Sequence, residues 1–464
     1  MSSRVRVVGV SHVLPATGAD GAAGSPLLPD DHLLKLSFMD CLFVAVVPMQ
    51  RLFFYQGPSV PAFPCVVHSL RSSLAAVLRH FLPLAGKLAY YPPSSAAAGS
   101  GLVVDCSPDA VSPGVSFVEA QFAGTIADMR RVASGEEHDP EALARLGPEL
   151  EAGRLPAPVL AVQVTRPADD HGHGGVVVGV SIHHAVADGH SVWQFMRAWS
   201  AVSRSSQGLV PRPTFDRAVI RHPEADELAI KFLRTFAPAS AYVRSSRPTL
   251  DLDQRRRSFL IRPDQIQSVK QRIMEQSVAI GKQLDKHQAP TSRCRRSCGR
   301  PSCAPRRGGG GDDDDDTCYF LVPVDCRRSL PGVGEGYFGN CLSLSFARAA
   351  ARDLMRSDAG MAHAAAAIRE VARETVASPL RGAERWAEAY AGMPRESFTP
   401  SGSSNRFMAY ETDMGWGAPT QVELVSLVRK RMVLLLGAPN GAVQVTVALD
   451  HAHMDRFAAN FLQV

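Results

Sequence analysis

One segment of the chain constrains the fold and indicates chemistry at the same time. The apolar run Val176 to Val180 is typical of a buried strand, and it leads directly into Ser181–Gly189, SIHHAVADG. His184 therefore stands at the mouth of a buried strand, with Asp188 four residues later and Gly189 where the chain can turn. A histidine in this position is suited to act as a general base at neutral pH.

The four-residue spacing alone is a weak signal. Roughly one such match is expected by chance in a chain with fifteen histidines. The chain has three matches, namely His184/Asp188, His222/Asp226 and His451/Asp455. His222 precedes a proline and a charged run, which is typical of a solvated helix start, and His451 falls in the first turn of the last predicted helix. Only His184 follows a buried strand and has a glycine after its aspartate, so we favour it.

Strand geometry separates the two neighbouring histidines. Side chains alternate between faces, so His184 continues the row of Val180 and Ile182, whereas His183 falls on the other face. We assign a structural role to His183. For His184 the alternative is a satisfied core histidine with no catalytic role.

Length and composition indicate an ordinary globular protein. A chain of 464 residues suggests two domains, and 45% hydrophobic with 20% charged residues is typical of a soluble protein. The chain contains no run of about 18 apolar residues, so the sequence does not predict a membrane span. The N-terminus alternates like a strand and lacks a signal peptide's apolar block. We therefore expect a cytoplasmic monomer whose nine cysteines are free thiols.

The net charge of +5 does not indicate nucleic-acid binding. Residues 291–307 alone carry six arginines and no acid, and aspartates 312–316 follow them. Without these arginines the chain is close to neutral, and no aromatic platform or basic groove pattern accompanies the cluster. We expect neither a nucleic-acid nor a membrane partner.

Hydrophobic periodicity predicts an α/β chain. Strands are predicted at 158–165, at 175–182 and near 257–262, and a hairpin turn at Pro439–Gly441 between 432–436 and 443–449. Helices are predicted around 70–82 with a break at Pro83, after Gly189, from Asp264, and at about 453–462. We predict an N-terminal domain over 1–204, a crossover linker over 205–240 and a C-terminal domain over 241–464.

Other segments add to the His184 motif. The most informative is Asp413-Met414-Gly415-Trp416-Gly417, and a second is Tyr337-Phe338-Gly339-Asn340-Cys341. With HxxxD at His184, they resemble the HxxxD, DFGWG and YFGNC signatures of the plant BAHD acyltransferases, in particular of the anthocyanin and flavonoid-glucoside malonyltransferase branch. The segments 36–40, 50–55 and 81–88 also resemble that branch. Met414 departs from the family's phenylalanine but keeps an apolar side chain of similar size.

The resemblance implies a fold and a reaction. It implies two similarly folded coenzyme A-dependent acyltransferase domains, chloramphenicol acetyltransferase-like, with a channel at their interface. His184 would take the proton of an acceptor hydroxyl as the oxygen attacks the thioester carbonyl of an acyl-CoA. No permanent cofactor and no metal are implied, and malonyl-CoA would serve as co-substrate.

The resemblance also implies structural roles around the histidine. Asp188 would turn away from His184 and pair with an arginine, and Gly189 would allow a sharp turn. Asp413 would be structural and paired with Arg327, Gly415 and Gly417 would permit close packing, and Trp416 would anchor the segment. Tyr337, Phe338, Gly339, Asn340 and Cys341 mark the branch.

Residues 291–307 depart strongly from the family pattern, which has an apolar strand and helix at this place. We consider three interpretations. A zinc site at Cys294, Cys298 and Cys303 is disfavoured, because the spacings do not form CxxC pairs. The whole segment 291–316 can be an inserted surface loop. We favour the third, a local change of reading frame that replaces one buried helix.

The sequence thus predicts an acyl-CoA-dependent O-acyltransferase that moves malonyl from malonyl-CoA to a sugar hydroxyl of a phenolic, flavonoid or anthocyanin glucoside. A hydroxycinnamoyl-CoA donor is the first alternative. The second is a catalytically impaired homologue without enzymatic function.

Overall fold

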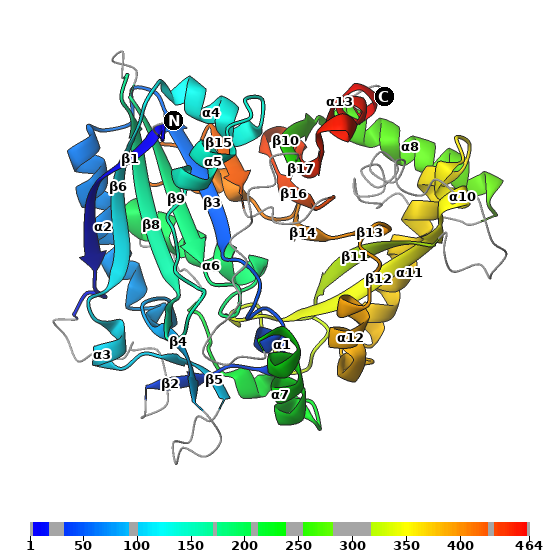
Figure 1. Cartoon of the computed structure of the whole chain (residues 1–464), viewed down its shortest axis with the longest axis horizontal. Coiled ribbons are helices and arrows are strands. Elements are labelled where there is room, and N and C mark those ends of the chain that lie inside the picture. Colours follow the sequence, from blue (N-terminus) through cyan, green and yellow to red (C-terminus); the bar gives the residue numbers. More distant parts are fainter. Residues whose placement is uncertain are drawn as a thin grey trace. The chain divides into compact units, whose positions relative to one another are not determined.

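The structure is a computed structural model that describes residues 3–17, 32–91, 101–169, 174–205, 212–237, 254–281, 317–425 and 431–461. The chain divides into two compact units built from interleaved segments (Figure 1). Unit 1 comprises Met1–Leu250, Leu330–Cys341 and Met408–Ser426. Unit 2 comprises Asp251–Ser329, Leu342–Phe407 and Leu427–Val464.

The division follows packing rather than chain order. The predicted N-terminal domain, 1–204, lies within unit 1, and so does the predicted linker, 205–240, which carries the helix α7 (Ala225–Phe236). Two segments of the predicted second domain, Leu330–Cys341 and Met408–Ser426, also belong to unit 1. Since these segments contain the YFGNC and DMGWG motifs, all three motifs belong to one unit.

Unit 1 contains two sheets. The larger has the strand order β1 (Val5–Val13), β6 (Val115–Phe122), β8 (Leu160–Pro167), β9 (Gly175–Ile182), β3 (Met49–Gln56) and β15 (Gln421–Leu424). The smaller has the order β2 (Leu33–Lys35), β5 (Gly101–Asp105), β4 (Lys87–Tyr91) and β7 (Ala157–Pro158). The central strand β9 is rich in valine, whose branched side chain suits a pleated surface, and it pairs antiparallel with both β8 and β3.

Helices cover both faces of the larger sheet. The described helices of unit 1 are α1 (Phe38–Cys41), α2 (Phe63–Leu78), α3 (Pro108–Val111), α4 (Ile126–Ser134), α5 (Pro140–Leu146), α6 (Gly189–Ser203) and α7, with short 3-10 turns at Leu82–Leu84, Arg217–Val219 and Ala409–Glu411. One face, with Phe54 and Val177, packs against α4 and α5 in a continuous apolar cluster. On the other face Phe53 contacts Trp193 of α6 edge to face, with ring centroids 6.0 Å apart. This second face ends at His184.

Unit 2 also contains two sheets. One has the order β10 (Gln254–Ile261), β17 (Val443–Asp450), β16 (Val433–Gly437) and β14 (Ser401–Ser404), and the other β12 (Leu342–Ala350), β11 (Thr317–Asp325) and β13 (Phe398–Thr399). The described helices are α8 (Pro263–Ala279), α10 (Ala351–Met355), α11 (Gly360–Ala377), α12 (Trp386–Ala391) and α13 (His451–Phe461), with 3-10 turns at Ala383–Arg385 and Pro439–Gly441. Phe457 and Phe461 of α13 pack on Phe259 of β10 in one core cluster.

Most elements predicted from periodicity are confirmed. The strands at 158–165, 175–182 and 257–262 correspond to β8, β9 and β10, and the helices after Gly189 and Pro263 to α6 and α8. The hairpin is present as β16 and β17, with Asn440 at a φ of 58° in the turn. The helix predicted to run to Pro83 ends earlier, at Leu78. The prediction was too long because Phe81, which is buried but lies outside the helix, continues the apolar pattern.

Some predictions lie outside the described residues. These are the arginine-rich segment 291–307 and the aspartate run that follows it. In the part of the chain that is described, no helix is long and apolar enough to cross a bilayer. No disulfide bond joins the described cysteines, which are Cys41, Cys65, Cys106, Cys318, Cys326 and Cys341.

Candidate active site

His184 lies in the short turn between β9 and α6. The strand ends at Ile182, and His183 N still donates to Val159 O at 2.9 Å, so the turn starts from a fixed position. The His184 side chain is half-buried. Its ring stacks on Phe43 with centroids 4.3 Å apart and an interplanar angle of 7°. The imidazole is thus held flat against a buried aromatic surface.

The environment keeps His184 neutral. The pKa of its imidazole is lowered from 6.5 to about 4, mainly by burial and to a smaller extent by the positive charge of Arg51. The backbone carbonyl of His184, the carboxylate of Asp188 and the amide of Asn340 act in the opposite direction. A neutral imidazole has a free lone pair at neutral pH, which is the first requirement of a general base.

Both carboxylate oxygens of Asp188 accept hydrogen bonds from backbone amides. Its Oδ1 accepts from Ser191 N at 2.9 Å and so caps α6, and its Oδ2 accepts from Cys341 N at 3.0 Å. One carboxylate therefore fixes the start of the helix and ties it to the YFGNC segment. Gly189 is the first residue of α6, so the change of direction falls at Asp188, whose backbone is extended.

A buried ionic network lies beneath the turn. Asp40 is fully buried and accepts from Arg217 Nε at 3.0 Å, from Ser37 N at 3.0 Å and from Ser37 Oγ at 2.9 Å. Its other oxygen accepts from Asn340 N at 2.8 Å and from Asn340 Nδ2 at 2.9 Å. Arg217 also donates to Phe338 O and to Val186 O, the latter at 3.4 Å. The network joins three distant segments directly below His184.

The YFGNC segment is closely packed against its neighbours. A Cβ on Gly339 would lie 2.7 Å from Arg217 Cζ and 2.8 Å from Tyr337 Oη, so close approach requires glycine here. Phe338 is fully buried and contacts Phe81 and Phe215 edge to face. The Arg217 guanidinium lies 5.3 Å from the centroid of the Tyr337 ring.

The DMGWG segment is fastened to the C-terminal half of α6. Ser200 Oγ donates to Asp413 O at 2.7 Å, and Ser203 Oγ donates to Met414 O at 2.8 Å. Asp413 Oδ1 accepts from the amides of Gly415 and Gly417 at 2.8 and 2.9 Å. Both glycines have a positive φ, of 98° and 94°, and the space around them is open. Backbone conformation, and not close packing as the sequence suggested, therefore requires glycine at these two positions.

Two further expectations concern the contacts of Trp416 and the pairing of Asp413 with Arg327. Trp416 is buried and contacts Tyr55 edge to face at 5.3 Å, as an anchor should. Arg327 is buried in unit 2, where its Nη1 lies 3.1 Å from Asp325 Oδ1. Asp413 belongs to unit 1, 4.0 Å from Arg204 Nη1, so its pairing with Arg327 stays a prediction.

Sequence reasoning did not assign roles to three residues of the site. Phe43 and Arg217 were not singled out, and Asp40 was noted only as part of a family-like segment. For Asp40 a signal existed, because an acid within the apolar run Phe38 to Phe43 must find partners if the run is buried. The other HxxxD matches have different surroundings. Asp226 forms an exposed ion pair with Lys35, and His451 starts α13 of unit 2.

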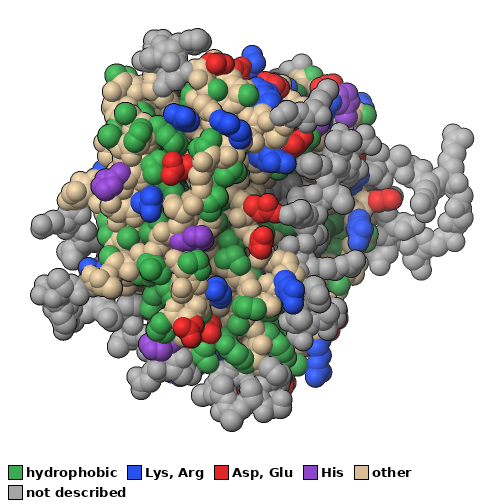
Figure 2. Space-filling model, turned by 60° about the vertical axis from the view of Figure 1, so that its left-hand side comes forward, with side chains coloured by type: hydrophobic (Ala, Val, Ile, Leu, Met, Phe, Trp, Pro, Cys, Tyr) green, Lys and Arg blue, Asp and Glu red, His purple; other side chains and the backbone are tan. Residues whose placement is uncertain are grey.

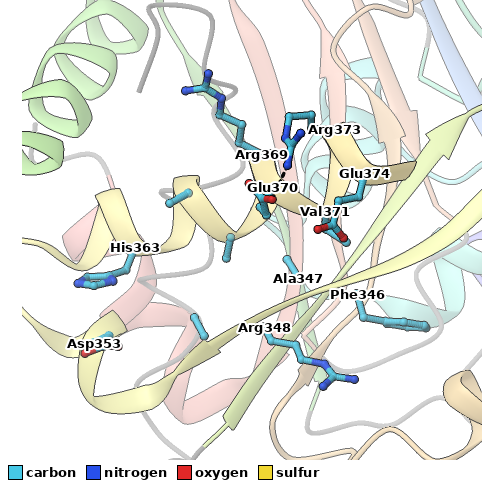
Figure 3. A pocket seen from close by; sticks show the side chains of 13 residues that line it. Phe346, Ala347, Arg348, Asp353, His363, Arg369, Glu370, Val371, Arg373 and Glu374 are labelled. Carbon is cyan, nitrogen blue, oxygen red and sulfur yellow. Dashed lines mark hydrogen bonds and ion pairs between the residues drawn. The ribbon is translucent and has the colours of Figure 1, made fainter. Parts of the chain in front are cut away.

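A cavity of about 850 Å³ lies in unit 2, between α11 and β12 (Figure 3). Charges of both signs line it, among them Arg348, Arg369 and Glu374, and Arg373 donates to Glu370 at 2.6 Å. It contains none of the motif residues. Among the described residues, no three His, Cys, Asp or Glu side chains gather as a metal site. The candidate active site is therefore the turn around His184.

Comparison with known structures agrees with this architecture. Over 97% of the chain, the fold matches vinorine synthase with a TM-score of 0.70, at 18% identity and 96% coverage of that protein. It matches TRI101 of F. sporotrichioides, solved with coenzyme A and T-2, with a TM-score of 0.68 at 17% identity, over 92% of the chain and 97% of that protein. The predicted fold class, that of the coenzyme A-dependent acyltransferases, is confirmed.

The sequence comparisons define the family. The model of the Transferase family matches residues 25–464, so the chain belongs to this family, the BAHD acyltransferases. Phenolic glucoside malonyltransferase 1 of Arabidopsis thaliana is 25% identical, over 98% of the chain and 96% of that protein. An anthocyanin 3-O-glucoside-6''-O-malonyltransferase of Dahlia pinnata is 26% identical over 92% of each chain. The chain is an acyltransferase, as the motifs predicted.

The stacking of Phe43 on His184 gives a first prediction. In a Phe43→Leu variant the apolar volume is largely kept but the flat surface under the imidazole is lost. We expect kcat to fall about tenfold with little change in KM, because the base loses orientation and its protonated form loses the aromatic face. Steady-state kinetics checks this. The control is Phe122→Leu, which removes a buried ring of the same unit that packs against α4 and α5. Equal loss of kcat in both variants would contradict the assignment.

Buried His183 gives a prediction about pH and stability. Burial lowers the pKa of His183 from 6.5 to about 3, and its Nδ1 accepts from Ala185 N at 3.1 Å. Since the unfolded chain binds a proton here that the folded chain excludes, stability is complete above about pH 6.5 and falls as the pH drops towards 3, with a slope of about 1.4 kcal/mol per pH unit. His183→Asn keeps an acceptor for Ala185 N without titrating. Urea unfolding at several pH values should show a flatter dependence in the variant, and parallel curves would contradict this account.

Proposed function

We propose that the chain transfers malonyl from malonyl-CoA to a sugar hydroxyl of a phenolic, flavonoid or anthocyanin glucoside, with His184 as the general base. The observation that carries this proposal is a neutral, partly accessible imidazole at the end of β9, which stacks on Phe43 and lies in a turn hydrogen-bonded to the YFGNC segment. The choice of a malonyl donor and a glucoside acceptor is supported by relatives named for that activity, whose sequences align with nearly the whole chain.

The chemistry balances without further groups. The acceptor hydroxyl attacks the thioester carbonyl while its proton passes to His184. The tetrahedral intermediate then expels the coenzyme A thiolate, which takes the proton back from the imidazolium, so that the ester and free coenzyme A are the products. Because a thiolate is a good leaving group, one correctly placed base suffices. General-base assistance typically contributes about 10²–10⁴-fold in rate.

We propose further that the protein acts as a cytoplasmic monomer on small molecules, without a resident metal or cofactor, and without nucleic-acid or membrane partners. The described cysteines form no disulfide bond, which is consistent with a reducing compartment. On the face that Figure 2 shows, the described basic and acidic side chains are interspersed, which gives no field of one sign for a polyanion.

A thiol-release assay with malonyl-CoA and coumaroyl-CoA tests the donor. We expect malonyl-CoA to give the higher kcat/KM with a phenolic glucoside as acceptor. The hydroxycinnamoyl alternative has one specific support, a 27% identical omega-hydroxypalmitate O-feruloyl transferase of Arabidopsis thaliana over 86% of the chain. A preference for coumaroyl-CoA would favour it. A cooperative thermal transition that rises with added coenzyme A, with no turnover of either donor, would instead support the impaired homologue.

A further inference from the structure

The side-chain amide of Asn340 has one orientation that satisfies its neighbours. Its Nδ2 lies 2.9 Å from Asp40 Oδ1 and 2.9 Å from the backbone oxygen of His184. Both neighbours are acceptors, so the amide must direct its NH₂ group towards them. The Oδ1 atom is consequently turned away from Asp40 and can accept a hydrogen bond from a different donor.

Asp40 makes this orientation rigid. It is fully buried, and five donors converge on its two oxygens from Ser37, Arg217 and Asn340 itself. A flipped amide would place its oxygen against this carboxylate in a region without water. Such a clash of two acceptors is strongly unfavourable inside a protein, where electrostatic interactions are little screened. The amide is therefore locked.

Two complementary atoms are left over at this position. Among the described residues, Asn340 Oδ1 and His184 Nδ1 are both buried and have no hydrogen-bond partner. One is an acceptor, and the other becomes a donor in the Nδ1–H tautomer and in the imidazolium. The amide that carries Oδ1 already binds the backbone of the same histidine. A hydrogen bond from Nδ1–H to Oδ1 would satisfy both atoms at once.

We propose that Asn340 is a positioning residue for His184. Its Oδ1 accepts a hydrogen bond from the protonated Nδ1 of the imidazole and thereby leaves Nε2 as the basic nitrogen, while Asp40 locks the amide. This inference rests on the proposed function in that His184 is taken as the base. During the reaction one proton stays on Nδ1, hydrogen-bonded to Asn340, and Nε2 takes the proton of the acceptor hydroxyl and returns it to the departing sulfur.

Two observations favour Asn340 over Asp188 for this role. Both oxygens of Asp188 already accept from backbone amides, at Ser191 and Cys341. The second observation concerns charge, because the carboxylate of Asp188 raises the pKa of His184 more than the neutral amide of Asn340 does. A neutral acceptor orients the ring while adding no charge that would raise this pKa into the neutral range.

The tautomer can be read directly by NMR of the full chain with isotope-labelled histidine, in which the His184 signals are identified by their loss in His184→Gln. We expect the wild-type ring to be protonated at Nδ1. In Asn340→Ala we expect the Nε2–H tautomer to become populated and kcat to fall roughly tenfold or more with KM largely kept, because a base with the wrong tautomer loses its lone pair at the reacting position.

Ser191→Ala is the matched control, because Ser191 Oγ bonds both the amide and the carbonyl of Gly339 next door without touching the Asn340 side chain. In this control variant the tautomer of His184 should remain that of the wild type. A wild-type ring protonated at Nε2 would overturn the inference even if the Asn340 variant does not fold, and so would a folded variant with an unchanged tautomer. Since the tautomer is read without substrate, a failure of malonyl transfer would overturn only the proposed function.

Discussion

Replacing His184 by alanine should lower kcat by about 10²–10⁴-fold while leaving the fold intact, because the variant removes the proton acceptor but little buried contact apart from the Phe43 ring. The measurement is thiol release under saturating malonyl-CoA and acceptor. Because burial lowers the pKa of His184 to about 4, the wild-type rate should not be limited by protonation of this histidine at neutral pH. The effect of the variant should therefore be the same across that range.

The matched control is His222→Ala. This residue has the same spacing to an aspartate and precedes α7. Its Nδ1 accepts from the nearby amide of Glu224, and its ring centroid lies 5.7 Å from that of Phe38. We expect full activity and an unchanged thermal transition. If His184→Ala retained wild-type kcat, the assignment of the base would be wrong, although membership of the family would stand.

The second large effect concerns stability. In Arg217→Ala the buried carboxylate of Asp40 loses its guanidinium partner, and Phe338 O and Val186 O lose donors. Breaking a buried pair in this way leaves an uncompensated charge, so we expect the free energy of unfolding to fall by about 3–5 kcal/mol. Urea unfolding followed by tryptophan fluorescence is well suited to this test, because Trp193, Trp199 and Trp416 all lie in unit 1.

An exposed pair provides the comparison. Lys35 Nζ lies 2.8 Å from Asp226 Oδ1, but their side chains are 46% and 80% exposed. Lys35→Ala should cost less than about 1 kcal/mol, because water screens the exposed charges and replaces the lost contact. Similar losses in the two variants would show that Asp40 is reached by solvent and that the network below His184 is not a buried one.

Local patterns in the sequence were sufficient for the main elements. The valine-rich strand β9, the amphipathic helix α6 and the Pro-Asn-Gly hairpin each depend on neighbours within a few residues. His184 could be identified because a strand, a spacing and a glycine coincided at one place. The prediction that close packing requires the glycines of the DMGWG segment was wrong. Their positive φ angles require glycine, and neither composition nor motif spacing reveals a φ angle.

The network around the base could not be predicted by the same means. Asp40 and Arg217 are 177 positions apart, and Asp40 and Asn340 are 300 apart. No periodicity connects such residues, because their contact depends on how sheet and helices pack. The stacking of Phe43 on His184 could not be predicted for the same reason, because the two loops that carry these residues meet only after β3 and β9 have paired.

The interleaving of the units has a consequence during synthesis. When His184 leaves the ribosome, neither Asn340 nor the strand β15, which pairs with β3, has been made. Roughly 240 further residues must be added before β15 can close that edge, which takes about 10–50 s at ordinary translation rates. Throughout this time β3 presents an open, apolar edge to the cell. Nascent chains of this protein should therefore depend on chaperones until translation is almost complete.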